Sequence, residues 1–322
     1  MKPQVSICVI NKNTETTIER SLRSVLVQLN EDYEVVIVDE STDGSIEIIK
    51  RLMVEYPNRI RLILLSKNSQ RGIGFARNVS IKEAKGDYCV MHIDCDDVWQ
   101  PHISDFCSVF FQIESALGSQ FLLAGHQINM ARREFLLTLG PYREVEHGED
   151  RDLWMRLAKR DQYIPIDHVA FFSRLPLSRS VNIGKALRRT IWGVRDEVRK
   201  GSRIGQYFSD LSIKKGSLAW NLRLARLLIY PYARFTSLLL SKFDPNDYFM
   251  NVSEWNDYKA RNFGTFREIA KLRGFSGELD FFKSDLAKAI FSRRRGEISY
   301  EQLVDELATT NFDGKLSRND SK

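Results

Sequence analysis

Short apolar runs alternate with stretches of helical periodicity along residues 4–125. Four runs have the length and composition of buried strands: VSICVI (5–10), YEVVIV (33–38), RIRLILL (59–65) and DYCVMHI (87–93). Between the first two runs, five apolar side chains would share one helical face: Ile18, Leu22, Val25, Leu26 and Leu29. We expect this helix to open on Thr14 as its N-cap. The alternation predicts an α/β fold with a doubly wound, parallel sheet.

The predicted strands bring acidic side chains to one edge of the sheet. Asp39 ends the second strand and Asp94 ends the fourth. Because right-handed crossovers place the carboxyl ends of parallel strands together, both should reach the edge where ligands of open α/β sheets bind. In the loop VDESTDGS, Asp43 either caps the following helix or faces a ligand, and both interpretations stay open.

The segment MHIDCDDVWQP (91–101) places three carboxylates within four positions, at Asp94, Asp96 and Asp97. Crowded negative charge is costly without a compensating group. One interpretation is a divalent cation, since magnesium and manganese prefer carboxylate oxygen. The other is a turn followed by a helix N-cap, which is the common use of clustered Asp before a helix.

A second acidic pair, Glu149 and Asp150, opens the segment HGEDRDLWMRLAKR (147–160). The apolar spacing predicts a helix in which Leu153, Trp154 and Leu157 face inward. From composition alone, an acidic pair at a helix start complements the helix dipole. Trp154 fits the core better than a sugar-stacking platform.

Composition narrows the class of protein. The 322 residues carry 48 Lys and Arg against 42 Asp and Glu, a formal charge of +6, which suits anionic partners such as nucleic acid, phosphorylated metabolites or anionic lipid. None of the four cysteines forms a C-x-x-C pair, so we expect a reduced, cytoplasmic protein without a zinc site. The N-terminal MKPQVSICVINKN resembles a first strand rather than a signal peptide.

The character of the chain changes after about residue 175. We expect a first domain at 1–178, a mostly helical extension at 179–310 and a flexible tail at 311–322. The most apolar stretch, 217–243, is no ordinary transmembrane helix, because three arginines interrupt it and Pro231 should break it. Two uses stay open: a peripheral, interfacial contact with a membrane, or packing against the first domain.

Four quoted segments in order resemble one family: VSICVINKNTETTIERSLRSVLVQ, YEVVIVDESTDGS, RGIGFARNVSIKEAKGDYCVMHIDCDD and EHGEDRDLWMRL. They are similar to the inverting glycosyltransferases of family 2, over approximately residues 4–175. The resemblance implies a GT-A, Rossmann-like fold that binds a nucleotide-diphosphosugar. Asn13 and Glu15 match the segment near the nucleotide, Asp39 the acid that holds the base, and Arg77 an arginine that faces the nucleotide or sugar.

The same resemblance implies the metal and catalytic groups. Asp94 and Asp96 match the family's Asp-x-Asp, in which the first carboxylate lies near ribose and metal and the second coordinates a divalent cation, Mn²⁺ or Mg²⁺. Asp150 matches the catalytic base, and Glu149 assists it by binding the acceptor or orienting the site. The implied function is metal-dependent, inverting transfer of a sugar, in the manner of hexosyltransferases, to a glycan, lipid-linked or polysaccharide precursor.

Other function classes fit the residues less well. A Rossmann-type oxidoreductase should carry a glycine fingerprint after its first strand, where INKNTET has no glycine. No nucleic-acid recognition motif is present, and the excess of positive charge is modest. A non-catalytic nucleotide-sugar-binding relative is the main alternative to the enzyme.

The expected location is the cytoplasm or the inner face of the cell membrane.

Overall fold

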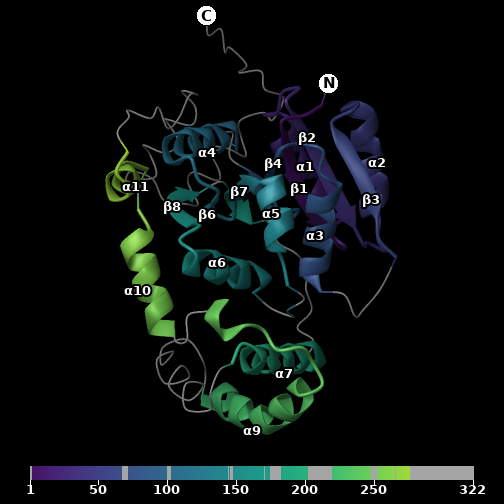
Figure 1. Cartoon of the computed structure of the whole chain (residues 1–322). Coiled ribbons are helices and arrows are strands. Elements are labelled where there is room, and N and C mark those ends of the chain that lie inside the picture. The colour runs from purple at the N-terminus through teal and green to yellow at the C-terminus, as the bar shows by residue number, and fades with distance from the viewer. Residues whose placement is uncertain are drawn as a thin grey trace, which may run out of the picture.

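The structure is a computed structural model of the whole chain (Figure 1). It describes residues 2–66, 72–99, 103–143, 145, 148–169, 171–174, 183–201, 220–247, 252–264 and 266–275. The expected tail at 311–322 lies outside these described residues.

A seven-stranded sheet forms the centre of the described molecule, in the order β3-β2-β1-β4-β7-β6-β8. Its strands are β1 (Val5–Asn11), β2 (Tyr33–Asp39), β3 (Ile60–Leu64), β4 (Tyr88–Asp94), β6 (Leu122–His126), β7 (Asn129–Arg132) and β8 (Tyr163–Val169). Strands β1 to β4 are parallel to one another, and β7 runs antiparallel to both of its neighbours. The four strands predicted from apolar runs are therefore confirmed, within one residue at either end.

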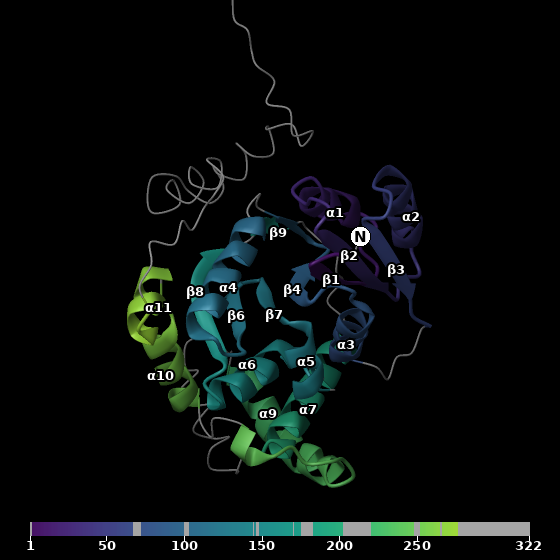
Figure 2. The same ribbon diagram turned by 45° about the horizontal axis from the view of Figure 1, so that its top comes forward.

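Helices cover both faces of this sheet (Figures 1 and 2). One core cluster joins the sheet to α1 (Ile18–Leu26), α2 (Ser45–Glu55) and α4 (Ile103–Leu117). The other joins it to α3 (Ile73–Glu83), α5 (Arg133–Leu139) and α6 (Glu149–Lys159). The alternation of β1 sets these faces, because Ile7 and Val9 belong to the first cluster and Cys8 to the second.

The first helix begins at Ile18, so the expected N-cap at Thr14 is wrong. The carbonyl of Thr14 accepts hydrogen bonds from the amides of Thr17 and Ile18, which makes residues 14–17 a turn before the helix. The amide of Thr14 instead donates to Ser45 Oγ at 3.1 Å, so this residue ties two loops together.

The acidic segment after β4 leads into a short strand rather than a helix. Strand β5 (Asp97–Trp99) pairs antiparallel with β9 (Phe171–Arg174) in a separate two-stranded sheet. Of the alternative interpretation, the turn is confirmed at residues 95 and 96, but the helix N-cap is wrong, because a strand follows the turn. Asp97 is fully buried at the start of β5.

The described part of the C-terminal region is helical, with α7 (Ile183–Arg199), α9 (Trp220–Ser237), the 3-10 turn η1 (Pro245–Asp247), α10 (Val252–Asn262) and α11 (Phe266–Arg273). Helices α7 and α9 lie side by side, beyond α6 and away from the sheet (Figure 1). Helix α9 continues through Pro231, contrary to the expected break. None of the helices that the structure describes has the length and apolar character needed to traverse a bilayer.

Candidate active site

The carboxyl ends of three adjacent strands form the floor of the candidate site. In the register of the sheet, Asn11 of β1 lies beside Asp39 of β2, and Ile10 lies beside Asp94 of β4. Neighbouring strands are about 4.8 Å apart, so the two acids flank the end of β1 from opposite sides. The sheet thus brings Asp39 and Asp94 to one edge, as the sequence predicts.

Asp39 is buried and held by short hydrogen bonds. Asn11 Nδ2 donates to its Oδ2 at 2.5 Å, and the backbone amide of Ser41 donates to its Oδ1 at 2.7 Å. Ser41 Oγ also lies 3.1 Å from Oδ2. These donors stabilise a buried carboxylate that would otherwise be costly to desolvate.

Asn13 and Glu15 lie in the loop after β1 and bind the loop after β2. Asn13 has a left-handed backbone, with φ of 54°, and its Oδ1 accepts from the amide of Thr42 at 2.8 Å. Glu15 Oε2 accepts from the amide of Gly44 at 3.1 Å. A Cβ at Gly44 would displace the Glu15 carboxylate from its present position. Both side chains therefore shape the loop that borders Asp39.

Asp43 of this loop has a structural role. Its Oδ1 accepts from the amide of Ser45 at 3.1 Å, and its Oδ2 accepts from the amide of Glu15 at 3.1 Å. Burial alone would raise the pKa of Asp43, but these hydrogen bonds lower it below its usual value. The carboxylate holds the start of α2 against the first loop.

Three carboxylates after β4 converge. One oxygen from each of Asp94, Asp96 and Asp97 lies within 4.8 Å of the others. An all-oxygen donor set of this kind fits a hard divalent cation such as Mg²⁺ or Mn²⁺. The sequence prediction gave the metal to Asp94 and Asp96, and the structure adds the buried Asp97 to this group.

Hydroxyl groups of α1 fix the backbone of the acidic segment. Thr17 Oγ1 donates to the carbonyl of Cys95 at 2.9 Å, and Ser21 Oγ donates to the carbonyl of Asp94 at 3.2 Å. Further along, the amide of Trp99 donates to Ser24 Oγ at 2.9 Å. The acids therefore stand on a backbone tied to a packed helix.

Arg77 of α3 joins the acidic segment to the acidic start of α6. Its Nη2 lies 3.4 Å from Asp94 Oδ1, and its Nε donates to Glu149 Oε1 at 3.2 Å. Burial alone would lower the pKa of the guanidinium, but the negative groups around it, led by Asp94, raise it. Arg77 is not a solvated charge on the helix surface, because its side chain is only 9% exposed.

Asp150 lies next to Glu149 and contacts a histidine that the sequence reasoning did not select. His92 Nε2 lies 3.3 Å from Asp150 Oδ2, and the amide of Arg151 donates to Oδ1 at 2.7 Å. Burial would raise the pKa of Asp150, but His92 and the Arg151 amide lower it to about 2. The signal in the sequence is a polar residue between Met91 and Ile93, inside an otherwise apolar run.

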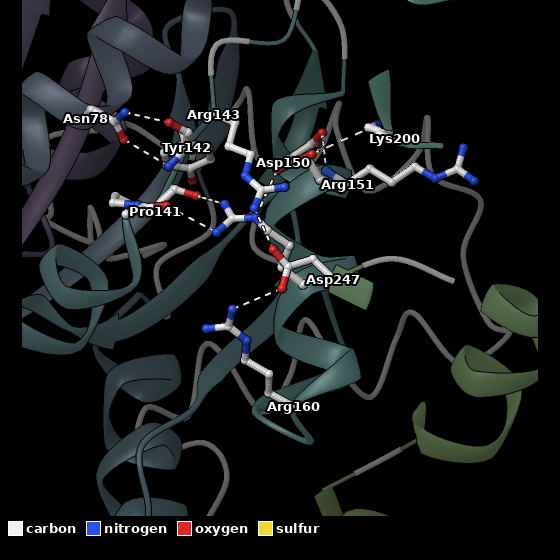
Figure 3. Close-up of polar contacts among 12 residues, drawn as sticks. Asn78, Pro141, Tyr142, Arg143, Asp150, Arg151, Arg160, Lys200 and Asp247 are labelled. Carbon is white, nitrogen blue, oxygen red and sulfur yellow. Dashed lines mark hydrogen bonds and ion pairs between the residues drawn. The ribbon is translucent and has the colours of Figure 1, made fainter. Parts of the chain in front are cut away.

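The loop before α6 is held against α3. Asn78 Nδ2 donates to the carbonyl of Tyr142 at 2.7 Å, and the amide of Tyr142 donates back to Asn78 Oδ1 at 3.0 Å (Figure 3). Gly74 permits this approach, because a Cβ there would lie 2.8 Å from the carbonyl oxygen of Arg143. Trp154 of α6 packs against the second core cluster, in agreement with the interpretation as a core residue.

Charged pairs hold α6 from its other side. Asp247 of η1 lies between two guanidinium groups, 2.5 Å from Arg143 Nη2 and 3.0 Å from Arg160 Nη2 (Figure 3). Within α6, Arg156 Nε donates to the fully buried Asp152 at 3.0 Å. These contacts therefore fix the position of both ends of α6, the helix that begins with Glu149 and Asp150.

Comparison with known proteins gives a family match and several curated relatives. Residues 6–116 match the family model described as Glycosyl transferase family 2. An uncharacterized glycosyltransferase of Nostoc sp., alr2836, is 34% identical over 116 residues, which cover 36% of this chain and 35% of that protein. WfaP of Escherichia coli, a UDP-Glc:alpha-D-GlcNAc-diphosphoundecaprenol beta-1,3-glucosyltransferase, is 31% identical over 130 residues, covering 38% of this chain and 49% of that protein. The chain thus spans between a third and a half of these curated relatives.

A solved structure shares the fold. TarS 1–349 of S. aureus, in complex with UDP-GlcNAc, superimposes with a TM-score of 0.52 at 16% identity, covering 84% of this chain and 90% of that chain. At this identity the likeness concerns the fold alone. The expected GT-A fold is confirmed.

Proposed function

We propose, given that residues 6–116 match the model of glycosyltransferase family 2, that this chain transfers a sugar from a nucleotide-diphosphosugar to a hydroxyl acceptor. One observation carries the proposal. Arg77 contacts both Asp94, at the end of β4, and Glu149, at the start of α6. It thereby holds the candidate donor-binding acids and the candidate catalytic acids around a single centre.

On the donor side, we assign the nucleotide to the end of β1 and β2. Asp39 would accept from the base, while Asn13 and Glu15 keep the bordering loop in place. Asp94 and Asp96, with Asp97 behind them, would hold a divalent cation and the donor diphosphate. The cation supplies Lewis-acid and electrostatic stabilisation of the departing diphosphate.

On the acceptor side, Asp150 would act as the general base. Its side chain is 26% exposed, so an acceptor hydroxyl can reach it, and its lowered pKa keeps the carboxylate ionised. The carboxylate accepts the hydroxyl proton as the oxygen attacks the anomeric carbon and the bond to the diphosphate breaks. A single displacement of this kind inverts the anomeric configuration. Arg77 keeps Glu149 beside the base.

The first experiment is calorimetric titration of UDP, GDP, CDP and dTDP, each with and without Mn²⁺. We expect one nucleotide to bind far more tightly with the metal, and Asp96→Asn to lose that metal dependence. Asp87→Asn is the matched control, because Asp87 is exposed and precedes the opposite end of the same strand, β4. Binding of no nucleotide by the wild-type chain, with or without metal, would contradict the assignment of the donor site.

The alternative, a non-catalytic nucleotide-sugar-binding relative, predicts binding without turnover. With the donor identified, transfer to alcohols, glycans and lipid-linked sugars distinguishes the two. We expect Asp150→Asn to abolish transfer while nucleotide affinity changes less than about twofold, because a base acts mainly in the transition state. NMR of the product's anomeric proton tests inversion.

An apolar stripe along α9 and the turn after it supports a peripheral membrane contact for the segment 217–243. The stripe consists of Leu228, Tyr232 and Phe235 of α9, at helical spacing, and of Leu239 in the turn, and these side chains are 58–84% exposed. Helix α9 lies outermost, beyond α7 (Figure 1). A row of large exposed apolar side chains at helical spacing is typical of a helix that lies in a membrane interface.

The charges beside the stripe favour an anionic lipid surface as its partner. Arg234 and Lys242 are exposed on the same segment, and Arg188 is exposed on the neighbouring α7. Basic residues near an anionic leaflet each contribute about 1 kcal/mol of attraction. We therefore assign the stripe to an anionic membrane surface, where a lipid-linked acceptor would also lie.

A further inference from the structure

The strand that leads to the acidic segment contains an irregularity at His92. Strand β4 pairs with β1 through Val90 beside Ile7, and next through Ile93 beside Val9. Two residues of β4 therefore stand opposite the single residue between Ile7 and Val9, which is the arrangement of a β-bulge. His92 is one of the two, and its φ is 74°.

The bulge decides which face His92 occupies. Val90 and Ile93 both belong to the core cluster on the α1 side, whereas Met91 belongs to the cluster on the α6 side. In a regular strand, residues 90 and 92 would share a face and Ile93 would take the other. The extra residue keeps Ile93 in its core and allows His92 to contact Asp150 and Trp154 of α6.

This backbone conformation is costly for histidine. A residue other than glycine in the left-handed region costs on the order of 1–3 kcal/mol and persists only where the surroundings hold it. Such residues are concentrated at functional sites. The bulge is therefore a strained feature placed two residues before Asp94, in contact with the candidate base.

His92 and Asp150 differ in burial, which indicates different roles. The His92 side chain is 6% exposed and Asp150 is 26% exposed, so Asp150 faces the acceptor and His92 lies behind it. We propose that His92 is a positioning residue, whose buried Nε2, 3.3 Å from Asp150 Oδ2, holds the carboxylate toward the acceptor hydroxyl through a polar contact rather than a well-aligned hydrogen bond. The inference rests on the proposed function, in which Asp150 is the base.

Two substitutions separate the side-chain contact from the backbone conformation. His92→Gln retains a donor near the position of Nε2, whereas His92→Asn has a shorter side chain that does not reach Asp150. Asn, however, tolerates the left-handed backbone better than Gln does. A contact role predicts that Gln preserves activity better than Asn, and a purely structural role predicts the reverse order.

Steady-state kinetics with the donor identified above give the first readout. We expect His92→Asn to lower kcat by about 10- to 100-fold, as a misplaced catalytic group does, with the donor KM nearly unchanged. His92→Gln should stay within about fivefold of wild type, as expected when the orienting polar contact is kept. An Asn variant that is more active than the Gln variant would overturn the proposal.

A second readout does not depend on activity. In ¹⁵N–¹H spectra of the imidazole rings, the His92 signals are identified by their loss in His92→Gln. We expect a protonated Nε2 whose resonance shifts on Asp150→Asn, and an unprotonated Nε2 or an unshifted resonance would refute the contact. If the wild-type chain transfers no sugar while the resonance shifts, the proposed function fails and the contact stands. If the chain is active and His92→Asn retains full kcat, only the positioning role fails.

Discussion

Arg77 and Glu149 are 72 positions apart in the sequence, yet Arg77 Nε lies 3.2 Å from Glu149 Oε1. Neither side chain is more than 10% exposed. The pair fixes α3 to the start of α6, so the position of the candidate catalytic acids depends on an arginine from another part of the chain.

Arg77→Met should therefore destabilise the fold strongly. Removing one partner of a buried ion pair leaves the other charge uncompensated, at a cost of about 3–5 kcal/mol in the free energy of unfolding. Arg51→Met is the matched control, because the pair of Arg51 with Glu19 is exposed and contributes only about 0–1 kcal/mol. Urea denaturation measures both, and similar losses for the two variants would contradict the structural role of Arg77.

Gly74→Ala tests the close approach of the loop before α6. The new Cβ would lie 2.8 Å from the carbonyl oxygen of Arg143, so the loop must move, and we expect a loss of about 1–3 kcal/mol. Gly193 in α7 has nothing within 4 Å of a Cβ, and Gly193→Ala should stabilise by about 0.5–1 kcal/mol. Thermal unfolding measures whether each variant is more or less stable than wild type. A Gly74→Ala variant as stable as wild type would show that the loop adapts freely.

The pKa of Asp150 predicts a contribution to stability that depends on pH. Its lowering from 3.8 to about 2 means that the folded state favours the carboxylate, by about 2 kcal/mol above pH 4. This contribution is lost as the pH falls from about 4 toward 2. Asp150→Asn should therefore be less stable than wild type at pH 6, with the difference shrinking at pH 3. Urea unfolding at both values measures it, and a difference that does not change with pH would argue against a lowered pKa.

The α9 stripe predicts binding to anionic vesicles. Wild-type protein should sediment with vesicles that contain phosphatidylglycerol and much less with pure phosphatidylcholine, since apolar burial and basic charge act together. Phe235→Ser with Leu239→Ser should reduce binding about tenfold or more, given the apolar area removed. Val54→Ser, on the 83% exposed Val54 of α2, is the matched control. Equal binding by the control and the double variant would exclude the stripe as the contact.

The sequence predicts the strands well, because a strand that is buried on both faces must consist mainly of apolar residues. Asp39 and Asp94 follow from the same logic, since the ends of parallel strands meet at one edge. The start of α1 is harder to predict, because the amide of Thr14 donates to Ser45, a residue that only the tertiary structure brings close. Local capping rules do not contain such partners.

The contacts of the candidate site depend on long-range geometry in the same way. From the sequence alone, Arg77 resembles an arginine on the exposed face of a helix. Only the position of α6 shows that its side chain is buried. His92 is visible in the sequence only as a polar interruption, because a bulge is a property of two paired strands. Pro231 is expected to break a helix, yet α9 runs through it with the proline exposed.

Asp247 has a consequence for how the described helices of the C-terminal region influence the site. Its one carboxylate pairs with both Arg143, before α6, and Arg160, directly after α6, and both guanidiniums lie within 3.0 Å of it. Without that carboxylate, two like charges would face each other across the gap and repel. A single carboxylate from η1 therefore replaces a repulsion between two arginines with two attractive contacts. These contacts link η1 to both ends of the helix that carries Glu149 and Asp150.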